Sequence, residues 1–347
     1  MIVYPIKFSP ILKEKIWGGN KLNSILGKET NSDKVGESWE ISDVDGNISE
    51  VSNGAYKGAD LKELIARFEH RLVGVSNFQK FGYDFPLLIK FLDAKTDLSV
   101  QVHPDDSMAK KYHNSFGKTE MWYIMDSDEN AEIVLGLKDK TTNPEILNHV
   151  TADNVDEVFN REQVKKGDSF FIPAGKIHAI GAGVLAAEIQ QTSDITYRVY
   201  DWDRTDDLGR SRELHTDLAQ KATKSFDTSG KAQYSINSNA ACNLVSCEYF
   251  TTNILDIKKP LVRDYKNLDA FVVFMCVEGT VQLNAGGQTE TLKMGETVLV
   301  PAITEKITFD SNNGKLLEVY VADNFTDKRN NPIAQSSQTE TPCLEVY

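Results

Sequence analysis

The feature that most constrains the fold is an internal repeat in two distant parts of the chain. Residues 167–178 read G-D-S-F-F-I-P-A-G-K-I-H, and residues 295–302 read G-E-T-V-L-V-P-A. In each copy a glycine and an acidic residue precede a short apolar run that ends at proline, which indicates a turn leading into a buried strand. Such a repeat predicts two related units in tandem. In the second copy Ile303 replaces the glycine and the histidine is lost.

Short strands dominate the rest of the chain. The expected strands include residues 85–92, 98–103, 120–125 and 131–137. Helical spacing is confined to residues 60–68, where Asp60 is placed to cap the helix, to a short segment from Pro104 towards Tyr112, and to residues 143–159. Many short strands with few helices predict a barrel or sandwich of mostly antiparallel strands.

A polar segment between Thr223 and Ser238 predicts the boundary between the two units, because Ser, Gly, Asn and Lys dominate it. We therefore expect an N-terminal domain over residues 1–225 with helical insertions, and a second, similar domain over residues 238–347. The candidate metal ligands described below all lie in the first range, so the first domain is the expected catalytic domain with the metal site, and the second lacks metal ligands.

The charge of the chain limits its partners. Lys and Arg number 38 against 51 for Asp and Glu, which gives a formal net charge of -13. An acidic surface repels phosphate backbones and anionic membranes, so we expect no nucleic-acid and no membrane partner. A small anion can still bind in a locally basic pocket. The four cysteines form no CxxC pair, and no apolar run is long enough to cross a bilayer, which favours a cytoplasmic protein.

Four side chains are candidate metal ligands. Gln101 and His103 are two residues apart on an expected strand and therefore share a face, as do Lys118 and Glu120. His178 follows a Pro-x-Gly turn that can bring it back over the same sheet. Two imidazoles, a carboxylate and an amide oxygen suit zinc, and Mn, Co or Fe(II) would also fit. Gln101 is the weakest candidate, because its amide could instead orient a water molecule.

Several segments together carry a family resemblance. They are residues 17–19, 36–39, 86–90, 98–105, 117–120, 172–178 and 190–198. On these segments the chain resembles the type I mannose-6-phosphate isomerases, and within them the compact bacterial branch. One motif departs from the longer relatives, which have Asn-His-Lys-Pro-Glu where this chain has Phe-Gly-Lys-Thr-Glu at residues 116–120.

The resemblance implies a mainly β fold of tandem cupin barrels (double-stranded β-helix or jelly roll) with a few short helices. It implies an enzyme that interconverts mannose 6-phosphate and fructose 6-phosphate through a cis-enediol, with one Zn²⁺ per chain, as a monomer or homodimer. The zinc ligands implied are Gln101, His103, Glu120 and His178. The active-site arginine and lysine of the family fall on Arg198 and Lys118.

Two roles remain open for each of these cations. Lys118 could transfer the proton or could hold substrate oxygens while it stays charged. Arg198 suits a phosphate or an enediolate oxygen, but it could also form an ion pair with Asp194 or Asp201. Further candidates for substrate binding are Ser99, Lys90 and Trp17.

Two other functions compete with the isomerase. A cupin with two histidines and one carboxylate can hold Fe(II) and activate oxygen, because that ligand set leaves open positions. A sugar-phosphate sensor would bind its ligand without turnover. Gln101 and Lys118 beside the site argue against the first alternative, and Lys118 with Arg198 favours catalysis over the second.

Overall fold

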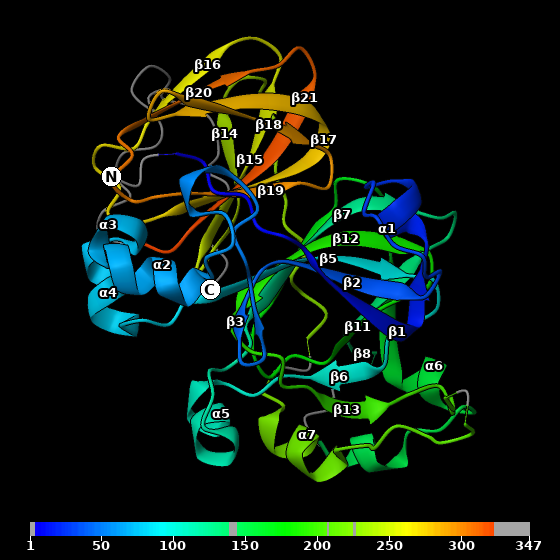
Figure 1. Ribbon diagram of the computed structural model, residues 1–347. Coiled ribbons are helices and arrows are strands. Elements are labelled where there is room, and N and C mark those ends of the chain that lie inside the picture. Colours follow the sequence, from blue (N-terminus) through cyan, green and yellow to red (C-terminus); the bar gives the residue numbers. More distant parts are fainter. Residues whose placement is uncertain (1–3, 139–143, 207, 225–226, 323–347) are drawn as a thin grey trace, which may run out of the picture. The chain divides into compact units, whose positions relative to one another are not determined.

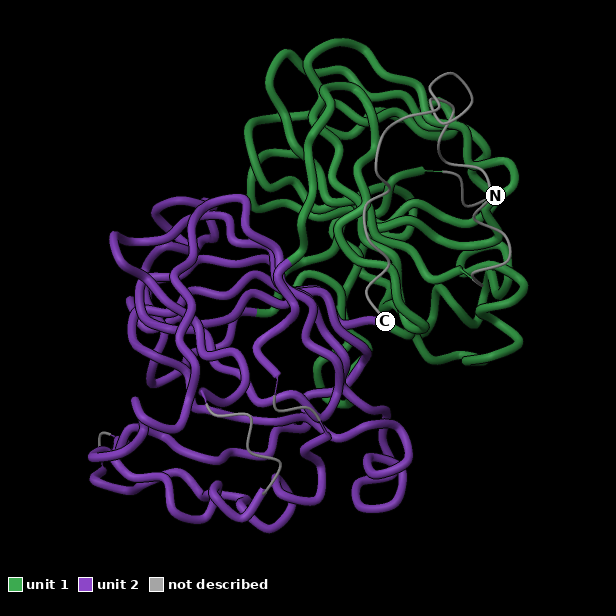
Figure 2. Tube along the Cα trace, turned by 180° about the vertical axis from the view of Figure 1, so that it is seen from behind, with its two compact units in different colours: residues 1–11, 40–86, 232–347 green, residues 12–39, 87–231 purple. Residues whose placement is uncertain are grey.

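The computed structural model describes residues 4–138, 144–206, 208–224 and 227–322 (Figure 1). The chain forms two compact units, each built from segments that are distant in the sequence (Figure 2). Unit 2 combines residues 12–39 with residues 87–231, and unit 1 combines residues 1–11, 40–86 and 232–347. The assignment of separate roles to an N-terminal and a C-terminal domain stays a prediction.

Unit 2 contains two antiparallel sheets. The first has the strand order β1-β2-β5-β12-β7-β10, and the second has the order β13-β6-β11-β8-β9. Their strands are β1 (Ile11–Gly19), β2 (Val35–Ile41), β5 (Leu87–Ala94), β6 (Val100–Val102), β7 (Glu120–Ser127), β8 (Glu132–Leu137), β9 (Phe159–Gln163), β10 (Ser169–Ile172), β11 (His178–Ile180), β12 (Val184–Gln191) and β13 (Tyr197–Tyr200).

The two sheets of unit 2 enclose one apolar core. Leu92 of β5 and Ile124 of β7, from the first sheet, pack in the same buried cluster as Leu135 of β8 and Ile180 of β11, from the second. Successive side chains of a strand point to opposite faces of the sheet, so one face of each sheet can supply this core while the other face is free to contact other elements or solvent. The result is a small barrel whose interior is filled by side chains.

Short helices cover the outer face of the second sheet. They are α5 (Asp106–His113), η2 (Pro144–His149), α6 (Val155–Val158) and α7 (Thr216–Ala222). A further short helix of this unit, α1 (Lys21–Ser24), directly follows the first strand, β1. Leu147 of η2 and Ala219 of α7 pack with Tyr197 and Val199 of β13 in a second buried cluster. The second sheet is therefore buried on both faces, which holds β6 and β13 firmly in place.

Unit 1 contains a sheet with the order β14-β15-β21-β17-β20-β16, in which β18 and β19 also pair with β17. Its strands are β14 (Ala241–Ser246), β15 (Thr251–Ile257), β16 (Leu261–Asp264), β17 (Val272–Ala285), β18 (Gln288–Lys293), β19 (Thr297–Val300), β20 (Lys306–Asp310) and β21 (Gly314–Tyr320). The small elements β3 (Asp43–Val44), β4 (Asn47–Ile48), η1 (Gly54–Tyr56), α2 (Leu61–Phe68), α3 (His70–Val73) and α4 (Val75–Phe81) also belong to it.

The strand pairings of the two units correspond. In unit 2, β7 pairs with β10 and β12, and β11 pairs with β6 and β8. In unit 1, β17 pairs with β19 and β21, and β20 pairs with β16 and β17. The repeated sequence motif therefore occupies the same place, at β10 and at β19. The prediction of two related, mainly β barrels is confirmed.

The helix expected over residues 60–68 is α2, and Asp60 caps it. The Asp60 side chain accepts a hydrogen bond from the Glu63 backbone N–H, and Glu63 reaches back to the Asp60 backbone. The helical segment expected over residues 143–159 is present as η2 and α6, except that Asn143 lies outside the described residues. None of the described helices is long and apolar enough to span a membrane.

Candidate metal centre and active-site pocket

Three buried side chains meet inside the barrel of unit 2. Glu120 is the first residue of β7, His178 is the first residue of β11, and His103 directly follows β6. Each has at most 1% of its surface exposed. Strand pairing sets their positions, because His178 lies opposite Gln101 of β6, and Glu120 lies opposite Gln190 of β12. Residues separated by as many as 75 positions are thereby brought into direct contact.

The distances between the three groups match the needs of a metal ion. Nε2 of His103 and Nε2 of His178 are 3.1 Å apart. Glu120 places Oε2 at 3.3 Å from His103 Nε2 and Oε1 at 3.4 Å from His178 Nε2. Ligand atoms at about 2.0–2.2 Å from a tetrahedral ion would be roughly 3.3 Å from one another. The three side chains therefore form a cluster that could hold a divalent metal ion.

Backbone carbonyls orient both imidazole rings. His103 Nδ1 lies 3.0 Å from the Ile195 carbonyl oxygen, and His178 Nδ1 lies 2.8 Å from the Lys176 carbonyl oxygen. A carbonyl only accepts, so each Nδ1 carries the proton and each Nε2 directs a lone pair into the cluster. Two lone pairs 3.1 Å apart repel each other, and a cation bound between them would relieve that repulsion. It would also satisfy the Glu120 Oε1 atom, which is buried without a hydrogen-bond partner among the described residues.

Electrostatics keep the three groups in the protonation state that a metal requires. Burial is the main cause that lowers the pKa of His103 to about 3 and that of His178 to about 4. Burial by itself would raise the pKa of Glu120, but the charge of Lys118 and the interactions with His103 and His178 together outweigh it, and the pKa lies well below its usual range. At neutral pH the cluster therefore presents two neutral imidazoles and one carboxylate.

Gln101 and Lys118 lie between the cluster and an adjoining cavity. The Gln101 side-chain amide is 3.4 Å from His178 Nε2, and Lys118 Nζ is 2.8 Å from His103 Nε2 and 2.5 Å from Glu120 Oε2. Both residues also line a cavity of about 200 Å³. The sequence-predicted residues Gln101, His103, Lys118, Glu120 and His178 thus lie together, as their strand positions indicated.

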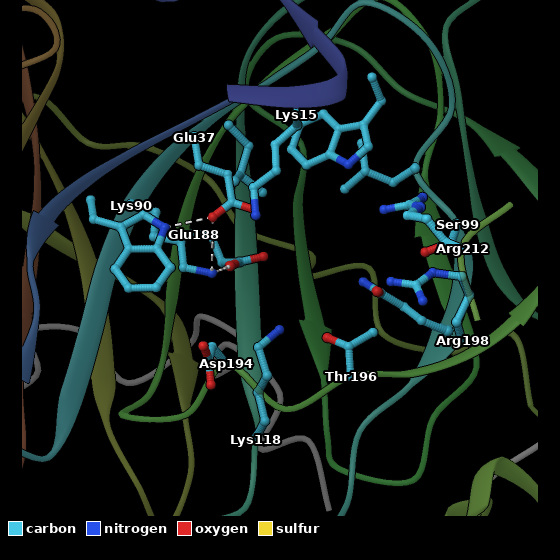
Figure 3. A pocket seen from close by; sticks show the side chains of 15 residues that line it. Lys15, Glu37, Lys90, Ser99, Lys118, Glu188, Asp194, Thr196, Arg198 and Arg212 are labelled. Atoms are coloured by element: carbon cyan, nitrogen blue, oxygen red, sulfur yellow. Dashed lines mark hydrogen bonds and ion pairs between the residues drawn. The ribbon is translucent and has the colours of Figure 1, made fainter. Parts of the chain in front are cut away.

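The cavity is lined mainly by charged and aromatic side chains (Figure 3). Its walls contain Lys15, Trp17, Glu37, Trp39, Lys90, Ser99, Lys118, Glu188, Asp194, Thr196, Arg198 and Arg212, besides Gln101 and two leucines. The predicted substrate-binding residues Ser99, Lys90 and Trp17 are all among them, as is Arg198. Five of the side chains are basic and three are acidic, so the cavity carries positive charge although the chain as a whole is acidic.

One wall of the cavity holds a network of buried charges (Figure 3). Lys90 Nζ lies 3.0 Å from Glu188 Oε1 and 3.9 Å from Glu37 Oε2, and Lys15 Nζ lies 3.0 Å from Glu37 Oε1. Glu188 also accepts a hydrogen bond of 3.0 Å from Trp122 Nε1. The pKa of Glu37 is lowered to about 2, because the two lysines and a tryptophan N–H outweigh the effect of burial.

Sequence reasoning missed Glu37 and Glu188 as parts of the site. Glu188 interrupts the otherwise apolar and amide-bearing β12, where every residue is buried. A carboxylate in a fully buried strand needs a cationic or hydrogen-bonding partner, so this position did carry a signal. Glu37 lies beside Trp39 in β2, but nothing in its local sequence connects it with Lys90.

The two acids considered as ion-pair partners of Arg198 have other positions. Asp201 forms ion pairs with Arg204 and Arg212. Asp194 lines the cavity. Arg198 itself donates a hydrogen bond of 2.7 Å from Nη1 to the Glu213 carbonyl oxygen, and its Nε is buried without a partner among the described residues. Its guanidinium therefore retains capacity to bind an anion.

Comparisons with known proteins agree with this site. A family profile for the type I phosphomannose isomerase catalytic domain matches residues 6–144, and one for the mannose-6-phosphate isomerase cupin domain matches residues 240–321. The mannose-6-phosphate isomerase ManA of Bacillus subtilis is 38% identical over 305 residues, covering 87% of this chain and 94% of that protein. The mannose-6-phosphate isomerase of Streptococcus mutans is 37% identical over 317 residues, covering 89% and 96%.

The solved structures give the same result. The crystal structure of the Bacillus subtilis mannose 6-phosphate isomerase superposes with a TM-score of 0.81 at 34% identity, and the match covers 91% of this chain and 99% of that one. Sequence and structure agree over nearly the whole length of these relatives, and both domains of the family are matched in order. The chain belongs to the type I phosphomannose isomerase family.

Proposed function

We propose that this chain interconverts mannose 6-phosphate and fructose 6-phosphate with the aid of one zinc ion. The observation that carries the proposal is the pair of inward-facing Nε2 lone pairs of His103 and His178, closed by the Glu120 carboxylate. Gln101 and Lys118 connect this cluster to a basic cavity, which both of them line. Gln101 is the proposed fourth ligand through its amide oxygen, since its side chain reaches the cluster, with the amide nitrogen 3.4 Å from His178 Nε2. Membership of the family supports the choice of substrate.

The reaction moves one proton from C2 of the aldose to C1 of the ketose, through a cis-enediol in which both carbons carry oxygen. A bound divalent ion supplies Lewis acidity, which polarises the carbonyl and hydroxyl oxygens of the sugar. The remaining tasks fall to the side chains of the chain itself. They must hold the phosphate, align C1 and C2, and accept and return the proton on one face of the sugar.

Lys118 is the proposed proton carrier. Its ammonium is buried, lines the cavity, and lies beside the proposed ligands His103 and Glu120. A lysine close to a bound cation gives up its proton more readily, because like charges disfavour the protonated form. The competing role is electrostatic, in which Lys118 stays charged and holds a substrate oxygen.

Arg198 and Ser99 are proposed to bind the substrate. Arg198 lines the cavity, and its buried Nε has no partner among the described residues. A planar guanidinium suits a phosphate or an enediolate oxygen, because it donates two parallel hydrogen bonds. Ser99 belongs to the same wall (Figure 3) and can donate its hydroxyl. Trp17 and Lys90 complete the proposed sugar-binding surface.

The metal proposal is tested by His103→Ala. We expect the purified wild type to contain about one zinc per chain by mass spectrometry of metals and to equilibrate mannose 6-phosphate with fructose 6-phosphate. His103→Ala should lose both properties. His149→Ala, at an exposed position outside the cluster, should retain both. A His103→Ala variant that is metal-free and fully active would refute the proposal.

The role of Lys118 is tested separately by Lys118→Met, which keeps most of the volume and removes the charge. A proton carrier predicts that zinc is retained while kcat falls by about 10²–10⁴-fold. A purely electrostatic holder of the substrate predicts instead that KM rises while kcat survives. Measuring metal content, kcat and KM on the same preparation decides between the two roles.

A further inference from the structure

Two arginines pair with one aspartate directly after β13, and a third arginine lies near them. Asp201 Oδ2 accepts a hydrogen bond of 2.7 Å from Nε of Arg212, and Oδ1 accepts a second from Nη2 of the same guanidinium. Arg204 Nη2 donates to Asp201 Oδ1 at 2.7 Å. The aspartate side chain is only 6% exposed. The one negative charge of Asp201 therefore lies buried between two arginines. Arg198 is close enough that the charges of Asp201, Arg204 and Arg212 all shift the pKa of Arg198.

The backbone next to Asp201 is strained and firmly held. Trp202 and Asp203 have φ values of 59° and 52°, in the left-handed region that non-glycine residues rarely adopt. The Trp202 indole N–H donates to the Leu98 carbonyl oxygen at 2.7 Å, and Tyr200 Oη donates to Asp203 Oδ2 at 3.2 Å. Such a conformation persists only where the surroundings determine it, and it is frequent at functional sites. It fixes Asp201 relative to Leu98, which lies two residues before β6.

Arg212 is presented to the cavity by this arrangement. Asp201 uses the Nε and Nη2 side of the planar guanidinium, so Nη1 points away from the carboxylate. Arg212 lines the cavity together with Arg198, and Figure 3 shows the two arginines on the same wall as Ser99. Its side chain is 27% exposed, so a solute can reach it.

The opposite wall offers less to an anion. Lys15 Nζ lies 3.0 Å from Oε1 of the buried Glu37, and Lys90 Nζ lies 3.0 Å from Oε1 of the buried Glu188, so both lysines already have an anionic partner. On the arginine wall, by contrast, burial and the charges of Arg212 and Arg204 lower the pKa of Arg198. A phosphate dianion placed there would relieve this repulsion and would accept from the buried Nε of Arg198.

We propose that Arg212 contacts the phosphate group of the substrate beside Arg198, and that Asp201 is the positioning residue that directs the Arg212 guanidinium into the cavity. This inference rests on the proposed function, since it assigns a phosphate-bearing substrate to the same site. It makes a prediction of opposite sign to simple electrostatics. Removing the negative charge of Asp201 should weaken phosphate binding, because Arg212 loses its orientation, although Coulomb's law alone predicts stronger binding.

The test uses Arg212→Gln and Asp201→Asn, with Arg210→Gln as the matched control. Arg210 lies two residues away, is 70% exposed and pairs with Asp206. Binding of inorganic phosphate is measured by isothermal titration calorimetry, and kcat and KM are measured with mannose 6-phosphate. We expect Arg212→Gln to raise the phosphate Kd and the KM by about 10- to 100-fold, as for loss of a charged hydrogen bond, while kcat changes little.

Asp201→Asn should raise the same two constants by a smaller factor, and Arg210→Gln should leave them unchanged. Phosphate affinity in Arg212→Gln equal to that of the wild type, or tighter phosphate binding in Asp201→Asn, would overturn the proposal. If circular dichroism shows that Arg212→Gln does not fold, Arg212→Lys takes its place. Lysine keeps the positive charge but cannot donate the paired guanidinium hydrogen bonds to Asp201. Phosphate affinity in Arg212→Lys equal to that of the wild type would then overturn the proposal. A wild type that binds phosphate but does not isomerise the sugar would refute the proposed function alone.

Discussion

Glu37 provides a quantitative test of how the cavity wall holds its buried charges. Its carboxylate is shared between Lys15 and Lys90 and accepts a hydrogen bond from Trp39 Nε1. Burial would raise the pKa of this carboxyl, but the two lysines and the indole N–H lower it from 4.5 to about 2. Glu37 should therefore stay ionised at pH values where an ordinary carboxyl is already protonated.

The direction of the pH effect follows from this difference in pKa. Because the pKa is lower in the folded state, Glu37 stabilises the fold fully above pH 4.5, and the stabilisation is lost as the pH falls towards 2. The difference between 4.5 and about 2 corresponds to about 3 kcal/mol at neutral pH. By the same relation about 1.4 kcal/mol remains at pH 3, so about 2 kcal/mol is lost between pH 7 and pH 3.

Glu37→Gln isolates this contribution, because glutamine keeps the shape and an acceptor for Trp39 but does not titrate. Urea unfolding of the wild type and the variant at pH 7 and pH 3 gives the difference in free energy of unfolding at each pH. We expect that difference to shrink by about 2 kcal/mol at the lower pH, since the other carboxyls titrate in both proteins. A difference that is the same at both pH values would refute the reasoning.

Three further predictions concern other parts of the molecule. Glu318→Gln should lower the free energy of unfolding by about 3–5 kcal/mol and leave metal content unchanged, because Glu318 is fully buried and binds Arg263 through both oxygens at 2.8 Å. Asp60→Ala should cost about 1 kcal/mol in urea unfolding, since the capping box of α2 is lost. Chelation by EDTA should lower the Tm and abolish turnover, and added zinc should restore both; an unchanged Tm would contradict a resident metal.

Local sequence patterns predicted much of the candidate site. Period-two alternation predicted that Gln101 and His103, and Lys118 and Glu120, share faces of two strands. In the structure His103 directly follows β6 and Lys118 lies two residues before β7, but the four side chains do lie together. The position of His178 came from the repeated motif, which leads into β11. These patterns can be recognised in the sequence because strand alternation and turn formation depend on only a few neighbouring residues.

Other parts of the site depend on contacts that no local pattern encodes. Glu188 and Lys90 lie opposite each other only because β12 pairs with β5, and their separation in the chain is 98 residues. An irregularity in the pairing of β13 with β6, between Arg198 and Tyr200, allows both Val199 and Tyr200 to be buried in the outer cluster while Arg198 lines the cavity. Simple alternation would have placed Tyr200 on the face of Arg198.

The sequence by itself determined the two mainly β units, the proposed ligand residues and the family to which they point, because each follows from short-range patterns or a repeated motif. Only the tertiary structure decided which charges meet. In the tertiary structure Glu37 forms ion pairs with Lys15 and Lys90, and Arg212 forms an ion pair with Asp201 beside the cavity. The physical reason is that strand register and buried ion pairs are set by packing between distant segments, whereas strand faces and turns are set by neighbouring residues.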